Sequence, residues 1–210
     1  MQLAVTPADA RSAEILQSIR KMFADKGFDG ASMQDLARAA GMSVGNFYRY
    51  FPSKAAIVEA LVMYDVKDVS REFEKVMEAP DPLAAVRFAL EEHVRGHLCD
   101  EDIDAPLWAE MSAAAMRKVE IATAMHRMED EIKNYFFRVF AKVTGLSVEE
   151  CAARFNAHVL FMMLMIKGSA MVCPPSLRTE PGLQALIMRA VDDVLADISA
   201  AKLSAQRAKG

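Results

Sequence analysis

Apolar residues recur at spacings of three, four and seven along nearly the whole chain, and no stretch alternates apolar and polar residues over the length of a strand. The first such repeat covers residues 15–23, with Pro7 suited to the start of its helix and Gly27 to its end. Ser32 and Gly41 bracket a second, shorter helix, as an N-cap and a left-handed terminator. The pattern therefore predicts an all-α fold.

Prolines and capping residues divide the rest of the chain into further helices. A third, very short helix begins after Ser43, because Pro52 follows closely. A long fourth helix is predicted over residues 54–77, with one apolar stripe. Further helices are expected at about 82–99, 105–115, 117–143, 148–172 and 181–199, and residues 200–210 are expected to fray.

These predicted helices suggest two domains. The first three, within residues 1–54, form an N-terminal domain, and residues 55–210 form a helical body. The helix over residues 54–77 bridges the two. Altogether the sequence predicts about nine helices and no strand.

The two short helices joined by residues 40–43 match the helix-turn-helix pattern, in which the second helix enters the DNA major groove. At 100° per residue, Phe47 and Phe51 share one side of that helix, and Gly45 and Arg49 lie nearly opposite. Arginine donates two hydrogen bonds to guanine, and glycine lets the backbone approach a base closely. On the residues alone, a small polar helix surface without a ligand is an equally good interpretation.

Five polar residues around this face suit the same target. Asn46 can pair with adenine, and the hydroxyls of Tyr48 and Tyr50 can donate to phosphates. Ser43 and Lys54 each offer a polar side chain at a helix start, where anions are favoured. The charge distribution agrees: residues 1–54 contain seven Lys and Arg against five Asp and Glu, although the whole chain carries a net charge of -4.

Two segments of the chain, FDGASMQDLA at 28–37 and AGMSVGNFYRYFPSK at 40–54, resemble the signature of the TetR family of transcription regulators. The resemblance implies an all-helical DNA-binding regulator rather than an enzyme, with a variable ligand-binding and dimerisation body. It implies base reading by Val44, Gly45, Asn46, Arg49 and Tyr50, and phosphate contacts from Ser32, Ser43, Tyr48 and Lys54. Asn46 stands where threonine is commoner in the family.

Residues 159–166 are eight consecutive apolar residues, so this helix is apolar on all sides. The run is far short of the roughly 20 residues that span a membrane, and no membrane segment is predicted. Burial on two sides suits a helix that packs on its own core and on a second subunit, as the resemblance implies. The expected homodimer interface comprises Phe161, Met165, Leu183, Ile187, Val191, Val194 and Leu195. Two subunits would read a palindrome with half-sites about 34–36 Å apart.

Fifteen methionines are many for 210 residues, and methionine adapts to varied apolar shapes. With nearby aromatic residues they suit a pocket for a hydrophobic or aromatic inducer, which the resemblance favours. Ordinary core packing is the alternative for any one of them. The expected lining is Val66, Phe88, Trp108, Met111, Met125, Met128, Phe136, Phe155 and Met162.

His93 and His97 lie four residues apart, a spacing that lets two imidazoles share a metal. Three widely spaced cysteines favour buried thiols over a disulfide framework or a zinc site. We expect no metal and no cofactor. A small helical enzyme that uses the two histidines is one alternative, although phosphate loops and a nucleophile elbow are absent. A helix-turn-helix module that binds only protein is another.

We expect a homodimeric repressor. We also expect it to be cytoplasmic, since the first residues lack the basic and then apolar run of a secretion signal. A small-molecule inducer would bind in the body and release the protein from a palindromic operator in double-stranded DNA. The change would pass through the helix over residues 54–77.

Overall fold

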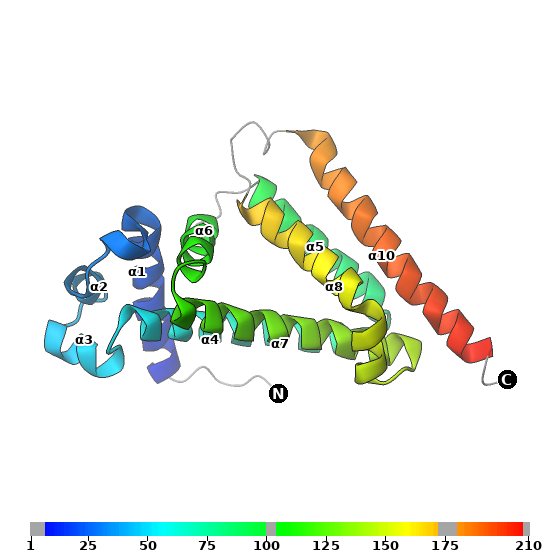
Figure 1. Cartoon of the computed structure of the whole chain (residues 1–210), viewed down its shortest axis with the longest axis horizontal. Helices are drawn as coiled ribbons and strands as arrows, with labels where there is room; N and C mark the ends of the chain where they lie inside the picture. Colours follow the sequence, from blue (N-terminus) through cyan, green and yellow to red (C-terminus); the bar gives the residue numbers. More distant parts are fainter. Residues whose placement is uncertain (1–6, 100–103, 172–179, 208–210) are drawn as a thin grey trace. The chain divides into compact units, whose positions relative to one another are not determined.

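A computed structural model of the chain describes residues 7–99, 104–171 and 180–207, and every regular element in those ranges is an α-helix (Figure 1). The helices are α1 (Pro7–Gly30), α2 (Met33–Ala39), α3 (Val44–Tyr50), α4 (Lys54–Glu78), α5 (Pro82–Cys99), α6 (Asp104–Ala115), α7 (Val119–Thr144), α8 (Val148–Met171) and α10 (Pro181–Arg207). The predicted all-α fold class is therefore confirmed.

The last helix is longer than the sequence pattern indicated. Residues 200–207, which were expected to fray, continue α10 as regular helix. Ile198 and Ala201 lie in the hydrophobic core, so packing holds the helix past residue 199. Periodicity alone could not show this, because the tail is rich in alanine and polar residues and lacks a clear apolar stripe. Residues 208–210 lie outside the described part of the chain.

The chain divides into two compact units. Unit 1 contains residues 1–66 and 103–128, and unit 2 contains residues 67–102 and 129–210. Unit 1 is thus larger than the three N-terminal helices, because it also includes α6 and the beginning of α7. Helices α4 and α7 each contribute their first turns to unit 1 and their remaining turns to unit 2.

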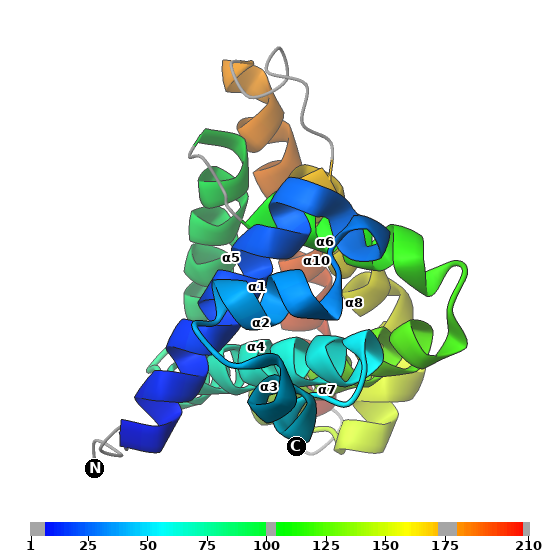
Figure 2. The same cartoon turned by 90° about the vertical axis from the view of Figure 1, so that its left-hand side faces the viewer.

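Unit 1 is built on α1, which packs on α2 and α6, while α2 packs on α3 (Figure 2). The apolar stripe of α1 is buried, and Ile19 and Phe23 have no exposed surface. On α6, which packs against α1, Leu107 and Met111 are buried as well. Burial of each such side chain contributes about 1.5–3 kcal/mol. The predicted stop at Gly27 is a kink, with φ at 72°, after which the chain turns once more to Gly30.

A buried ion pair joins two helices of unit 1. The Arg20 guanidinium of α1 donates to the Asp65 carboxylate of α4. Arg20 is 5% exposed at its side chain and Asp65 17%. Because both charges are largely removed from water, losing one of them leaves the other in a poorly solvated position.

Unit 2 packs α5, α8 and α10 against one another. Its core contains Phe136 and Phe140 of α7 together with Phe155 of α8, and the last two rings meet edge to face at a centroid distance of 5.9 Å. The predicted capping box before α8 is present, since Ser147 N donates to Glu150 and Glu150 N donates to Ser147 Oγ. Within the described ranges no helix is long and apolar enough to cross a membrane.

Candidate nucleic-acid interface

Helix α3 is short, and both its start and its inner side are tightly specified. Ser43 accepts a hydrogen bond from Asn46 N at 3.4 Å, which caps the first turn. The side chain of Phe47 is completely buried, and its ring lies 5.2 Å from the ring of Phe51. Gly41, at φ 64°, ends α2 in the left-handed conformation and lets α3 begin three residues later. The predicted helix-turn-helix geometry is thus present.

The side of α3 opposite Phe47 faces outward. We call the exposed residues Val44, Gly45, Asn46, Arg49 and Tyr50 the recognition surface. Tyr50 is 65% exposed, and Tyr48 is also exposed beside this surface. A Cβ atom added at Gly45 would meet nothing within 4 Å, so packing does not require glycine there.

Ser32 caps α2 in a reciprocal arrangement with Asp35. Ser32 Oγ donates to Asp35 Oδ2 at 2.7 Å, and Asp35 N donates to Ser32 Oγ at 3.1 Å. The Ser32 hydroxyl bond is the main cause that lowers the pKa of Asp35 to about 2, and Lys26 adds to it. The Ser32 hydroxyl therefore has a structural role, and its phosphate contact stays a prediction.

This pKa predicts how α2 responds to acid. The pKa of Asp35 is depressed when folded, so the stabilisation by the capping box is present above about pH 4 and is lost as the pH falls toward 2. In a carboxyl NMR titration, Ser32→Ala should raise the Asp35 midpoint toward the usual value for aspartate. Lys26→Met should raise it less, because the lysine is a smaller cause. An unchanged midpoint in Ser32→Ala would contradict the assignment.

The side chain of Lys54 is engaged at the end of α1. Its Nζ donates to the carbonyl oxygens of Phe28 at 2.7 Å and Asp29 at 3.1 Å. Burial lowers the pKa of Lys54, and the carboxylate of Asp29 partly offsets this. The last carbonyls of a helix have no intrahelical hydrogen-bond donor, and the ammonium of Lys54 supplies a donor for two of them here. The sequence showed only a lysine at a helix start; its phosphate contact stays a prediction.

The nine expected pocket residues divide between the two units. Val66, Trp108, Met111, Met125 and Met128 belong to unit 1, and Phe88, Phe136, Phe155 and Met162 belong to unit 2. The three methionines of unit 1 are buried, as are Phe136, Phe155 and Met162 in the core of unit 2. A surface hollow of unit 2 is lined by none of the nine, but by Ser70, Phe73, Glu74, Met77, Glu78, Tyr135 and Arg138.

Phe88 does not have the position that the sequence suggested. It is 65% exposed, whereas Val86, Leu90 and Val94 of the same helix are buried. These three follow one another at steps of four and form the inner side of α5, so Phe88, two residues from Val86 and from Leu90, points to the opposite side. Aromatic character alone therefore misplaced it.

The seven expected interface residues also separate into two groups. Phe161 is 38% exposed, and Met165, Leu183 and Ile187 are partly exposed. Val191, Val194 and Leu195 instead lie in the core of unit 2, where α10 packs on α5 and α8. The chain itself already covers them, so they have little surface left for a partner. Two exposed leucines of α8, Leu160 and Leu164, were not among the expected interface residues, and Leu186 of α10 is exposed as well. The apolar run at 159–166 was the available signal for the first two.

The possible metal ligands lie partly outside the described side chains. The side chains of His97, Cys99 and Cys173 are among those that the structure does not describe. Among the side chains that the structure describes, no group of three His, Cys, Asp or Glu is arranged to hold a metal ion. Cys151 is buried, and burial raises the pKa of its thiol. The expectation of a buried thiol is confirmed for this cysteine.

Comparisons with known proteins agree with this geometry. Residues 15–61 match the model of bacterial regulatory proteins of the tetR family. The chain is 28% identical over 134 residues to the HTH-type transcriptional regulator YfiR of Bacillus subtilis, covering 64% of this chain and 65% of YfiR. It is 36% identical over 85 residues to the regulator EthR of Mycolicibacterium smegmatis, covering 40% of this chain and 39% of EthR. The matches thus span less than two thirds of either relative.

Solved structures share the fold over most of the chain. GusR of Salmonella enterica superposes with a TM-score of 0.70 at 21% identity, covering 91% of this chain and 98% of GusR. The transcriptional regulator FadR of Bacillus subtilis, solved with stearoyl-CoA, has a TM-score of 0.66 at 15% identity, covering 87% and 97%. YfiR, EthR and FadR are all named as regulators, which argues against the small helical enzyme. Together with the helix-turn-helix, these matches show that residues 15–61 form a DNA-binding domain of the tetR family of bacterial regulatory proteins, on a chain that has the fold of solved transcription regulators.

Proposed function

We propose that this protein is a repressor that binds a palindromic operator as a homodimer and is released by a small hydrophobic or aromatic inducer. The recognition surface is the observation that carries the proposal. All of its residues are exposed, on a helix that the buried Phe47 holds in the fold. A helix held in this way can enter the major groove without losing its place in the fold.

Each residue of the surface has a chemical role in this proposal. Arg49 donates two hydrogen bonds to guanine, and Asn46 pairs with adenine or donates to a phosphate. Gly45 and Val44 allow the helix to approach the base edges, and Tyr50 completes the contact. The expected phosphate contacts come from Ser32, Ser43, Tyr48 and Lys54, and they set the register of the helix on DNA.

A seven-residue recognition helix contacts few base pairs, so specificity requires a second copy. The exposed apolar residues Leu160, Phe161 and Leu164 of α8 and Leu186 of α10 supply a surface for it. Met165, Leu183 and Ile187 border this surface in the proposed interface, whereas Val191, Val194 and Leu195 support it from the core. Large apolar side chains that one chain leaves exposed are typical of surfaces on which copies associate.

Phe161→Glu is expected to convert the dimer to a monomer, because it places a charge in the apolar surface that the two copies would bury. Sedimentation velocity should show half the mass at micromolar concentration. Phe88→Glu is the matched control, since it puts the same charge on an exposed phenylalanine of α5. A dimeric Phe161→Glu protein, or a monomeric Phe88→Glu protein, would contradict the proposed interface.

The inducer is proposed to be apolar, because the buried residues that would surround it are themselves apolar. Phe136, Phe155 and Met162 lie together in the core of unit 2, and methionine and aromatic side chains adapt to apolar ligands. FadR of Bacillus subtilis was solved with stearoyl-CoA, whose acyl chain is of this kind. Such a ligand releases DNA only if it binds the two states unequally, by about 1–3 kcal/mol for a fivefold to 150-fold effect.

The proposal is tested by incubating the dimer with fragments of its source genome and sequencing those that it retains. The expected result is enrichment of fragments that share an inverted repeat, with affinity that falls steeply as salt rises. Apolar compounds that lower the affinity for an enriched fragment are then candidate inducers. Absence of any enriched inverted repeat would refute the DNA-binding part of the proposal.

A further inference from the structure

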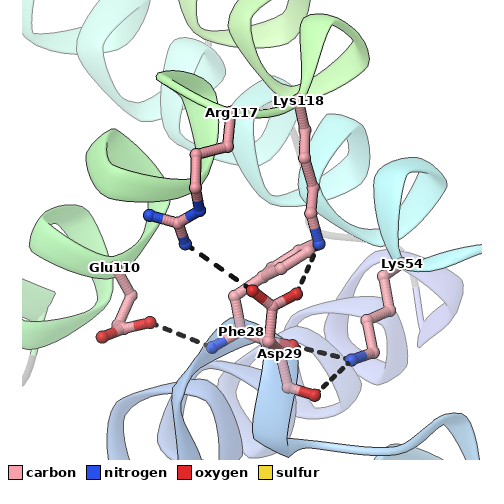
Figure 3. Close-up of polar contacts among 6 residues, drawn as sticks. All are labelled: Phe28, Asp29, Lys54, Glu110, Arg117 and Lys118. Atoms are coloured by element: carbon pink, nitrogen blue, oxygen red, sulfur yellow. Dashed lines mark hydrogen bonds and ion pairs between the residues drawn. The ribbon is translucent and has the colours of Figure 1, made fainter.

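The end of α1 is held by side chains from two other parts of unit 1 (Figure 3). The kink at Gly27 turns the backbone so that Phe28 N donates to the Glu110 carboxylate of α6 at 3.1 Å. A Cβ atom at Gly27 would lie 3.1 Å from the same carboxylate oxygen, which is tighter than an ordinary contact. The glycine thus provides both the positive φ and the space that Glu110 occupies.

The next residue, Asp29, holds the corner between α6 and α7. Its carboxylate accepts a hydrogen bond from Lys118 Nζ, and Arg117 lies 3.6 Å from its other oxygen (Figure 3). The hydrogen bond from Lys118 is the main cause that lowers the pKa of Asp29. Asp29 and Lys118 are 89 residues apart in the chain, so the pair is a purely tertiary contact.

Lys54 reaches the same turn from the beginning of α4. Besides its two hydrogen bonds to the carbonyls of Phe28 and Asp29, its ammonium lies 5.4 Å from the centre of the buried Phe28 ring. The ammonium of Lys118 lies 4.6 Å from the centre of that ring. Two cations therefore share one aromatic ring, and the carboxylate of Asp29 is the charge that offsets their repulsion. We call Phe28, Asp29, Lys54, Glu110 and Lys118 the Asp29 junction.

The junction is close to the recognition helix in the chain. Helix α3 ends at Tyr50, Pro52 and Ser53 follow, and Lys54 begins α4. Proline restricts the backbone of this link, so an anchor on Lys54 also restrains the end of α3. The link thereby couples the orientation of the recognition surface to the contacts of the Lys54 side chain.

We propose that Asp29 and Lys118 are positioning residues for DNA binding. They hold the corner between α6 and α7 against the end of α1, keep Lys54 on the carbonyls there and so orient the recognition surface without contacting DNA themselves. The inference rests on the proposed DNA-binding function. It makes a prediction opposite in sign to simple electrostatics, because an exposed carboxylate on a DNA-binding unit repels phosphates, and its removal alone should strengthen binding.

The test measures the affinity of the full-length protein for a genomic fragment selected with the wild type. Asp29→Asn and Lys118→Met should each lower the affinity about threefold to tenfold, within the range of substitutions in coupled networks. Lys118→Arg should bind like the wild type, because it keeps the cation. If Asp29→Asn binds as tightly as the wild type or more tightly, the positioning role is refuted. If Lys118→Met alone weakens binding, Lys118 is a phosphate contact instead.

Glu59→Gln is the matched control. Glu59 pairs with Arg127 at 2.6 Å, which also joins α4 to α7 within unit 1, and both side chains are exposed. The affinity of the Glu59→Gln protein for the fragment should stay within about twofold of the wild type, because an exposed ion pair contributes little. The melting temperature of each variant identifies an effect of partial unfolding. If Asp29→Asn binds like the wild type when its affinity is measured well below its melting temperature, the proposal is overturned. Failure of the wild type to select any fragment would instead refute DNA binding.

Discussion

Arg49→Ala is expected to lower the affinity for a selected operator about fivefold to 150-fold, equivalent to about 1–3 kcal/mol. Arg49 projects from the outward side of α3 and is exposed, so its removal leaves the core intact. In the proposed complex it donates two hydrogen bonds to guanine, and alanine can donate neither. The measurement is a binding isotherm at fixed salt on the operator and on single-base variants.

The pattern across variants separates base reading from general attraction. Arg49→Ala should lose the preference at one base pair of each half-site, whereas Tyr48→Phe, which removes a proposed phosphate contact, should weaken binding to all sequences alike. Arg49→Lys retains the charge but not the fork of donors, so it should restore affinity more than base preference. Arg49→Ala binding that matches the wild type on every sequence would show that this side chain reads no base.

Asp65→Ala is expected to destabilise unit 1 by about 3–5 kcal/mol. The substitution removes a carboxylate from the guanidinium of Arg20, which is only 5% exposed. Because the guanidinium is buried, water solvates it less well than the carboxylate compensates it. Hydrogen exchange of the α1 amides in increasing denaturant measures this loss for unit 1, since the two units need not unfold together.

A double variant shows whether the cost comes from the charge left behind. Arg20→Met combined with Asp65→Leu removes both charges and keeps apolar volume, and it should be far less destabilised than Asp65→Ala. Glu59→Gln, which breaks an exposed pair of the same unit, should cost about 0–1 kcal/mol. If Asp65→Ala cost no more than Glu59→Gln, the Arg20 pair would be of no consequence for stability.

The exposure of the residues of α3 could be predicted from the sequence, whereas the packing of α10 could not. On α3 a single buried residue, Phe47, determines which side faces outward, because seven residues make only two turns. On α10 apolar residues occur on two sides, and the sequence does not say which side faces α5 and α8. Val191 and Leu195 were therefore assigned to a partner although their own chain covers them.

The sequence by itself determined the all-α class, the starts of the short helices at Ser32 and Ser43, and the outward face of α3. These features depend on caps, prolines and helical periodicity, which act over a few residues. Only the tertiary structure decided that Lys54 serves the end of α1, 26 residues earlier, and that Arg20 meets Asp65, 45 residues later. A charged side chain can pair with many partners, and the fold alone selects which of them comes within reach.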